Sequence, residues 1–383
     1  MGLLTEHLPD FPWDTLAGAT ARARSHPGGI VDLSVGTPVD PTPEVVREAL
    51  AAAADSPGYP QTAGTPELRD AVVRWFARRR RVPDLDPAGV LPTLGSKELV
   101  ALLPSLLGLQ AGDVVLHPEV AYPTYDVGAR LAGATPEPCA DAAARLAADD
   151  EGTVRLVWLN SPGNPDGSVL SVEQVRGVVQ AARAAQARHG RPVVVASDEC
   201  YAELAWDEPW ASQGVPSLLD PRVTGGDHAG LLVAYSLSKQ SNLAGYRAAF
   251  VAGDAALVGR LLEVRKHAGF IVPGPVQAAM VAALGDDEHV ARQRARYERR
   301  RRLLVAAFGE AGYVVDGSHA GLYLWVRPEG GQGSRATVED LAGLGILVAP
   351  GVFYGSAGDG HVRVALTASD ERVGEASTRL TGA

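Results

Sequence analysis

The chain has 383 residues, 46% of them hydrophobic and 21% charged, so it can build a core larger than that of one ordinary domain. The net charge of -10 and the pI near 5.4 argue against a nucleic-acid partner, because nucleic-acid binders usually present a basic surface. The two cysteines, Cys139 and Cys200, lack the spacing of a zinc site or a disulfide framework, so we expect a reducing cytoplasm and no metal.

The amino-terminal segment has Glu6 and Asp10 where a signal peptide needs an unbroken apolar run, so we expect neither export nor a lipid anchor. A membrane-spanning helix needs about 18 consecutive apolar residues. The best candidate, from Leu99 to Leu109, is short and is interrupted by Pro104. We therefore expect no membrane partner.

Two arginine runs, Arg78–Arg81 and Arg299–Arg302, lie in patterns typical of helices. Long cationic side chains in such runs usually cover a solvated face, and we expect that arrangement for both runs. The Ala-rich stretch from Ala140 to Ala148 is expected to be a surface connection.

Three short apolar runs, at 154–159, 192–196 and 231–234, are typical of buried strands. Between the first two, residues 172–189 keep helical spacing, which indicates a parallel crossover. Ligands of open parallel sheets bind beyond the carboxyl ends of the strands. Each run ends in polar residues, which should therefore converge on one pocket: Asn160-Ser161, Ser197-Asp198-Glu199 and Ser236-Leu237-Ser238-Lys239.

The remainder of the chain changes character after the run from Arg247 to Ala252. Three helical patterns follow, at 254–267, 275–284 and 286–309, and then short strands with Gly-rich turns at 312–315, 321–326, 346–348 and 361–366. The pattern predicts an α/β fold: a large, mostly parallel sheet domain over 45–285 and a smaller α+β domain made of 1–44 and 286–383.

Lys239 is one of only three lysines in the chain and follows the third predicted strand. A partly desolvated lysine amine has a lowered pKa and condenses with carbonyl compounds. Ser236, Ser238 and Arg247 stand close by in sequence and could hold a phosphate dianion. The motif suits a phosphorylated aldehyde, and the alternative is an ordinary surface turn.

Asp198 ends the second predicted strand, and a buried carboxylate needs a cationic partner. A protonated pyridine nitrogen would be such a partner, and Tyr201 could donate to a phenolic oxygen on the same ring. The alternative for Asp198 is a cap on a turn. In the Ser161-Pro162-Gly163-Asn164-Pro165 turn, two prolines restrict the backbone and present the Asn164 amide, which suits an oxyanion.

These residues resemble the fold-type I pyridoxal-phosphate enzymes, and among them the class I and II aminotransferases. The resemblance covers nearly the whole chain, with one departure: Ser161 stands where the family's commoner turn has Asn. The motifs that carry it are Leu33 to Pro38, Tyr59 with Gly64 and Leu68-Arg69, Gly95-Ser96-Lys97-Glu98, Tyr122-Pro123-Thr124-Tyr125, Asn164-Pro165, Asp198-Glu199-Cys200-Tyr201, Ser236 to Arg247, and Arg363.

The resemblance implies a pyridoxal 5'-phosphate cofactor bound to Lys239 as a Schiff base, and it implies roles for the other motif residues. The cofactor phosphate would be bound by Gly95, Ser96 and Lys97 at a helix N-terminus, by Ser236, Ser238 and Arg247, and by Tyr59 of a neighbouring subunit. Tyr122 would stack on the ring, with Asp198, Tyr201 and Asn164 on its polar atoms. Arg363, Asn164 and the Gly36 backbone would hold the substrate α-carboxylate, unless Arg363 is a solvent-facing strand residue.

Within this family, four longer segments resemble the succinyldiaminopimelate aminotransferases: Phe11 to Leu16, Gly58 to Thr65, Ala121 to Gly128 and Arg265 to Gly269. This implies a homodimer that exchanges amino groups between glutamate and N-succinyl-2,6-diaminopimelate by a ping-pong reaction. The alternatives are an aspartate- or alanine-type aminotransferase, a β-lyase, and a non-catalytic regulator, which would need a DNA-binding domain. Arg265-Lys266-His267 is a candidate for contact with the succinyl arm, or else a solvated helix end.

Overall fold

The computed structural model describes residues 8–382, so Glu6 and the other residues of 1–7 lie outside the description. The larger of its sheets has the strand order β2-β8-β7-β6-β5-β3-β4. Strands β3 to β7 run parallel to their neighbours within this set, whereas β8 is antiparallel to both β7 and β2. The strands are β2 (Val90–Leu94), β3 (Val114–Pro118), β4 (Thr135–Cys139), β5 (Val154–Asn160), β6 (Val194–Asp198), β7 (Leu231–Ser236) and β8 (Ala248–Gly253).

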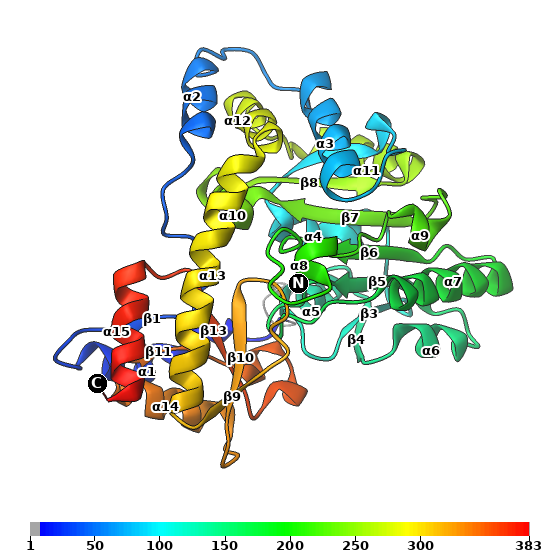
Figure 1. The fold of residues 1–383 in the computed structure, drawn as a ribbon. Helices are drawn as coiled ribbons and strands as arrows, with labels where there is room; N and C mark the ends of the chain where they lie inside the picture. The colour runs from blue at the N-terminus through cyan, green and yellow to red at the C-terminus, as the bar shows by residue number, and fades with distance from the viewer. Residues whose placement is uncertain (1–7, 383) are drawn as a thin grey trace, which may run out of the picture.

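Helices cover both faces of this sheet because the side chains of each strand alternate between the faces (Figure 1). In β5, Val157 joins the core under α3 (Pro66–Arg79), α7 (Val172–His189) and α12 (Gly274–Gly285). Trp158 joins the core of the opposite face, and this face is covered by α4 (Ser96–Leu106), α5 (Thr124–Leu131) and α11 (Ala255–Ala268).

The predicted central strands and the crossover helix are confirmed. Helix α7 spans the predicted 172–189 because Ser171 and Gln174 form a capping box at its start, and Gly190 ends it at a φ of 64°. Strands β2, β3 and β4 were not predicted, because each contains a proline, which is uncommon within strands. The expected surface connection at Ala140–Ala148 is wrong: it contains helix α6 (Ala142–Ala147), which buries Leu146 in the core under α7.

A second sheet has the order β12-β13-β10-β9 and is antiparallel throughout. Its strands are β9 (Tyr313–Asp316), β10 (Tyr323–Pro328), β12 (Ala349–Pro350) and β13 (Val362–Ala365). The 24-residue helix α13 (Asp287–Glu310) runs from beside α12 to this sheet (Figure 1). The core here also contains Leu16, Ala23 and Leu33, as expected for an amino-terminal segment that packs on the smaller sheet.

Short elements complete the fold. Strand β1 (Val31–Asp32) pairs in parallel with β11 (Ile346–Leu347), so an amino-terminal segment pairs with the carboxyl-terminal part of the chain. The domain boundaries at 44/45 and 285/286 stay a prediction. The remaining helices are η2 (Pro12–Leu16), α1 (Ala17–Arg24), α2 (Glu44–Ala52), η3 (Pro87–Gly89), α8 (Trp210–Gln213), α9 (Pro221–Thr224), α10 (Leu237–Gln240), η4 (Ala244–Tyr246), α14 (Ser334–Gly343), η5 (Gly351–Tyr354), η6 (Ser356–Gly358) and α15 (Asp370–Thr381).

Both arginine runs depart from the expected solvated faces. Arg80 is buried and pairs with Glu199 at 2.8 Å, and Arg300 is buried and pairs with Asp40 at 2.7 Å. The expectation is wrong at these two positions because each carboxylate compensates a guanidinium that the fold removes from water. Within residues 8–382, no helix combines the length and the apolar character that crossing a membrane requires.

Candidate active site

A cavity of about 530 Å³ lies where the carboxyl ends of β5, β6 and β7 face the smaller sheet. This volume is within the usual range for small-molecule sites. Twelve of the fourteen predicted site residues line it; Gly95 and Tyr59 do not. The twelve are Gly36, Ser96, Lys97, Tyr122, Asn164, Asp198, Tyr201, Ser236, Ser238, Lys239, Arg247 and Arg363.

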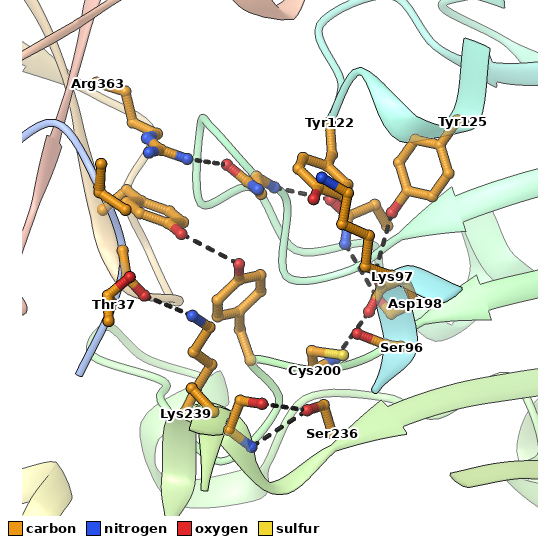
Figure 2. A pocket seen from close by; sticks show the side chains of 18 of the residues that line it. Thr37, Ser96, Lys97, Tyr122, Tyr125, Asp198, Cys200, Ser236, Lys239 and Arg363 are labelled. Atoms are coloured by element: carbon orange, nitrogen blue, oxygen red, sulfur yellow. Dashed lines mark hydrogen bonds between the residues drawn. The ribbon is translucent and has the colours of Figure 1, made fainter. Parts of the chain in front are cut away.

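Lys239 reaches the cavity from α10, the single turn of helix that follows β7 (Figure 2). Its amine is partly buried and donates a hydrogen bond to the Gly36 carbonyl. Gly36 belongs to the segment after β1, so the amine lies between the two sheets. An amine in this position can reach a carbonyl carbon inside the cavity, and the site therefore offers a nucleophile and a proton carrier.

One end of the cavity is built to bind an anion. Gly95 has a φ of 83° and is the N-cap residue of α4, whose first N–H groups have no partner within the helix. A Cβ on Gly95 would lie 2.1 Å from Nη2 of Arg247, so only glycine admits the guanidinium beside this helix N-terminus. Ser236 and Ser238 add hydroxyls that lie 2.8 Å apart. Backbone N–H groups, a guanidinium and hydroxyls are therefore three kinds of donor at this part of the cavity, which suits a phosphate.

Asp198 supplies the opposite charge and is buried at the end of β6. Its carboxylate accepts hydrogen bonds from the Tyr125 hydroxyl and the Cys200 N–H, both at 3.2 Å. Burial raises the pKa of Asp198, although the hydrogen bonds from Cys200 and Tyr125 oppose the shift. Among residues 8–382 no arginine or lysine forms an ion pair with it. A cationic group of a bound molecule would restore the ionised form.

Arg363 is 3% exposed and enters the cavity from β13 (Figure 2). Its guanidinium donates to Oδ1 of Asn164 at 3.0 Å and to the Ser34 carbonyl at 2.6 Å. The alternative of a solvent-facing arginine is therefore wrong. Its Nε is buried without a partner, and no carboxylate pairs with it within residues 8–382. A buried guanidinium held only by neutral oxygens is suited to a carboxylate ligand.

The turn before α7 positions Asn164 through Asn160, whose Oδ1 accepts the Asn164 N–H at 2.8 Å. Asn160 also donates to the Asp198 carbonyl at 3.0 Å, which ties the turn to the end of β6. Ser161, the departure from the family's commoner turn, accepts the Leu170 N–H at 3.0 Å and so closes the turn from the other side.

Sequence reasoning assigned no individual role to nine of the lining residues, although Asn160 was expected at the pocket as a strand-end residue. Tyr125 and Cys200 lie within motifs already recognised, and their neighbours could have indicated them. Tyr323 comes from β10 and has no motif of its own, so only the fold reveals it. The nine are Phe11, Trp13, Val35, Thr37, Tyr125, Asn160, Cys200, Ala244 and Tyr323.

Tyr59 and Arg265, two predicted residues that do not line the cavity, differ in their exposure to solvent. Tyr59 lies between α2 and α3 with its side chain 100% exposed. Arg265 is fully buried at the end of α11 and makes two bonds to Glu98, at 2.7 and 3.0 Å. The expectation that Arg265 is free to meet a substrate arm is wrong, because Glu98 already neutralises its charge. Lys266 is exposed and pairs with Glu263.

Comparison with known proteins agrees with this geometry. Residues 29–380 match the family described as aminotransferase class I and II. The chain is 57% identical over 381 residues to a "probable aminotransferase" of Mycobacterium tuberculosis, which covers 99% of this chain and 87% of that one. It is 54% identical over 374 residues to the 4-dedimethylamino-4-oxo-anhydrotetracycline transaminase OxyQ of Streptomyces rimosus, covering 98% and 99%.

A solved structure is similar along the whole fold. The "probable N-succinyldiaminopimelate aminotransferase" of Thermus thermophilus has a TM-score of 0.84 and 30% identity, covering 97% of this chain and 100% of that one. The family's cofactor carries a phosphate, a basic ring nitrogen and an aldehyde, which match the anion site, Asp198 and Lys239. The chain therefore belongs to the class I and II aminotransferases, which depend on pyridoxal phosphate.

Proposed function

We propose that this aminotransferase exchanges an amino group between glutamate and N-succinyl-2,6-diaminopimelate by a ping-pong reaction. The observation that carries the proposal is the number of cationic side chains in the cavity. If Lys239 and Arg247 bind the cofactor, two further cationic side chains are available to bind carboxylates of the substrate. These are Arg363, which is buried, and Lys97, whose amine lies 5.9 Å from the Tyr122 ring centroid. They stand on opposite sides of the view in Figure 2. Both substrates carry at least two carboxylates.

The cofactor, when bound, supplies an electron sink for the carbon that loses its proton. Lys239 is proposed to move that proton, because its amine enters the cavity from the end of β7. Asp198 holds the positive charge of the ring nitrogen, and Tyr201 donates to the ring oxygen. Arg363 and Asn164, together with the backbone of Gly36, hold the α-carboxylate and so orient the reacting carbon.

Ser96, Ser238 and Arg247 are proposed to bind the phosphate together with the N–H groups that follow Gly95. The backbone of Lys97 and the hydroxyl of Ser236 complete this set, and Tyr122 stacks on the ring. These roles are supported by the lining of the cavity, which brings the serine hydroxyls, Arg247, Asp198 and Tyr122 together.

A homodimer with shared active sites is proposed from Tyr59. Tyr59 belongs to a family motif and is fully exposed in the single chain. Contact with the cofactor phosphate of a neighbouring subunit would explain this exposure. Mixing an inactive Lys239→Ala subunit with a weakened Tyr59→Phe subunit tests this. Hybrids should regain one intact site and show activity above that of either parent alone. A monomer in sedimentation at assay concentration, or mixing without gain, would contradict the shared site.

A second candidate is amination of a carbocyclic ketone, favoured by the 54% identity to the tetracycline-pathway transaminase over 99% of that protein. The aromatic wall of Phe11, Trp13 and Tyr122 could pack on a fused-ring acceptor, with Phe11 and Trp13 at a centroid distance of 5.6 Å.

The deciding experiment separates the two half-reactions. The purified protein loaded with cofactor is treated with glutamate, freed of 2-oxoglutarate, and offered the succinylated 2-oxo acid, 4-oxo-anhydrotetracycline, oxaloacetate or pyruvate. We expect the succinylated acid to restore the original absorbance at the highest kcat/KM. Preference for oxaloacetate, pyruvate or the tetracyclic ketone would overturn the substrate assignment. In a separate assay without a 2-oxo acid, release of ammonia and pyruvate from a cysteine S-conjugate would indicate a lyase.

A further inference from the structure

Tyr323 occupies a position in the cavity that none of the assigned roles explains. It begins β10 in the smaller sheet, yet its hydroxyl lies 3.3 Å from that of Tyr201, which follows β6 in the larger sheet. Both rings are buried and meet edge to face at a centroid distance of 5.7 Å. This hydrogen bond therefore joins two phenols that come from different sheets.

The surroundings leave Tyr323 little freedom to move. The Arg363 guanidinium lies 3.9 Å from the centroid of its ring, within the range of a cation–π contact. A Cβ on Gly36 would lie 2.1 Å from the Tyr323 hydroxyl, so the absence of a side chain at Gly36 is what admits this oxygen. Tyr323 thus touches the group expected to hold the substrate carboxylate and the one expected to hold the ring oxygen.

The direction of the phenol–phenol hydrogen bond follows from what each hydroxyl can reach. If Tyr201 gives its single proton to the cofactor ring oxygen, its own oxygen can only accept from Tyr323. A hydroxyl that accepts a hydrogen bond becomes a better donor, because chains of hydrogen bonds polarise one another. Burial would raise the pKa of Tyr323, but the positive charges of Arg363 and Lys239 lower it. Tyr323 is therefore the better donor of the two.

We propose that Tyr323 is a positioning residue that couples the two halves of the site: its hydroxyl orients and strengthens Tyr201 as a donor to the cofactor, and its ring supports Arg363. This inference rests on the proposed contact between Tyr201 and the cofactor. It assigns two separable functions to one side chain. Removing the hydroxyl should affect the cofactor, and removing the ring as well should also affect the carboxylate subsite.

The first measurement is the dissociation constant of pyridoxal phosphate, titrated into cofactor-free protein, together with the absorbance maximum of the bound cofactor. Tyr323→Phe should weaken binding by roughly 2- to 10-fold, the equivalent of one hydrogen bond, and should shift the maximum in the same direction as Tyr201→Phe. In the Tyr201→Phe background the same change should have no further effect. Tyr354→Phe is the matched control, since Tyr354 also stacks on Arg363 but lacks a hydrogen bond to Tyr201.

The second measurement is the KM for glutamate. Tyr323→Phe keeps the ring under Arg363 and should leave KM within about 2-fold, whereas Tyr323→Leu should raise KM by roughly 2- to 5-fold, as expected for loss of a partly desolvated cation–π contact. Thermal unfolding of each variant shows that it is folded.

The outcomes separate the inference from its premise. A Tyr201→Phe variant that binds cofactor as the parent does, with the same absorbance, would remove the proposed role of Tyr201. If Tyr201→Phe has its effect while Tyr323→Phe matches the parent, or if the two effects add in full, only the coupling is wrong. Equal KM values for Tyr323→Phe and Tyr323→Leu would overturn the support of Arg363.

Discussion

Two buried arginines in this molecule have nearly the same exposure and very different surroundings. Arg80, at the end of α3, pairs with Glu199, and both side chains are 1% exposed. Its Nη1 also donates to the Val215 carbonyl at 2.8 Å. Arg363, in the cavity, contacts neutral oxygens and aromatic rings and has no ion pair among residues 8–382. The first arginine is compensated by the fold, and the second is left for a ligand to compensate.

The presence or absence of an ion-pair partner distinguishes buried charges that stabilise the fold from those available to a ligand. Removing a charge from water costs several kcal/mol per ion unless a partner offsets it. At Arg80, Arg265 and Arg300 the chain supplies that partner itself. Asp198 and Arg363 lack an ion pair within residues 8–382, and both line the same cavity. Uncompensated charges of both signs in one cavity indicate a ligand with both signs.

The largest effect should come from Lys239→Ala. The amine that attaches the cofactor and moves the proton is lost, and the other lysine of the cavity, Lys97, lies on a different wall. We expect turnover to fall by more than about 10⁴-fold, the upper range for one positioned acid–base group. Single-turnover absorbance with glutamate measures it, and circular dichroism checks the fold. Turnover within 100-fold of the parent would contradict the assignment.

Two variants test the difference between the two buried arginines. Arg363→Leu removes a charge that has no ion-pair partner in the described part of the chain, and Arg80→Leu removes one that is paired with Glu199. Arg363→Leu should lower kcat/KM for glutamate by roughly 10- to 100-fold, since a charged hydrogen bond contributes about 1.5–3 kcal/mol, with a melting temperature equal to or above that of the parent. Kinetics and calorimetry on the same preparation measure both quantities. A melting temperature several degrees lower would show that Arg363 is structural.

Arg80→Leu should do the reverse. It leaves Glu199 buried without a partner, so the free energy of unfolding should fall by about 3–5 kcal/mol. Chemical denaturation measures the loss. The double variant Arg80→Leu/Glu199→Leu is the control, because it removes both charges and should recover much of the stability. If the single variant is as stable as the parent, the distinction between the two arginines fails.

The smallest effect is expected from Lys97→Ala. This variant tests an exposed cation of the cavity, in contrast to the buried Arg363. An ion pair near solvent contributes about 0.2–1 kcal/mol, so KM for glutamate should rise by roughly 2- to 5-fold while KM for alanine stays unchanged. Steady-state kinetics with the two amino donors measure the contrast. Equal changes for both donors would assign Lys97 to the cofactor alone and remove the second carboxylate subsite.

Local sequence predicted most of what depends on short-range physics. The buried runs that became β5, β6 and β7 and the capped helix α7 follow from periodicity and turn chemistry. Because parallel strands end at one edge, the polar residues after each run were expected to meet, and Asp198 and Lys239 line one cavity. Strands β2, β3 and β4 escaped prediction because each contains proline. Helix α6 escaped it because alanine is common in surface connections as well as in helices.

The residues able to do chemistry could be recognised from the amino-acid sequence. Which of their charges remain available to a ligand depends on the packing of the folded chain. The residue type alone does not show which arginines have a carboxylate partner within residues 8–382, as Arg80, Arg265 and Arg300 do and Arg363 does not. Each acquires its function from whether a distant carboxylate reaches it, as Glu98 reaches Arg265 across 167 positions of the chain. Tyr323 shows the same dependence, since its contact with Tyr201 spans 122 positions. Such pairings arise from packing of whole elements, and no local pattern records them.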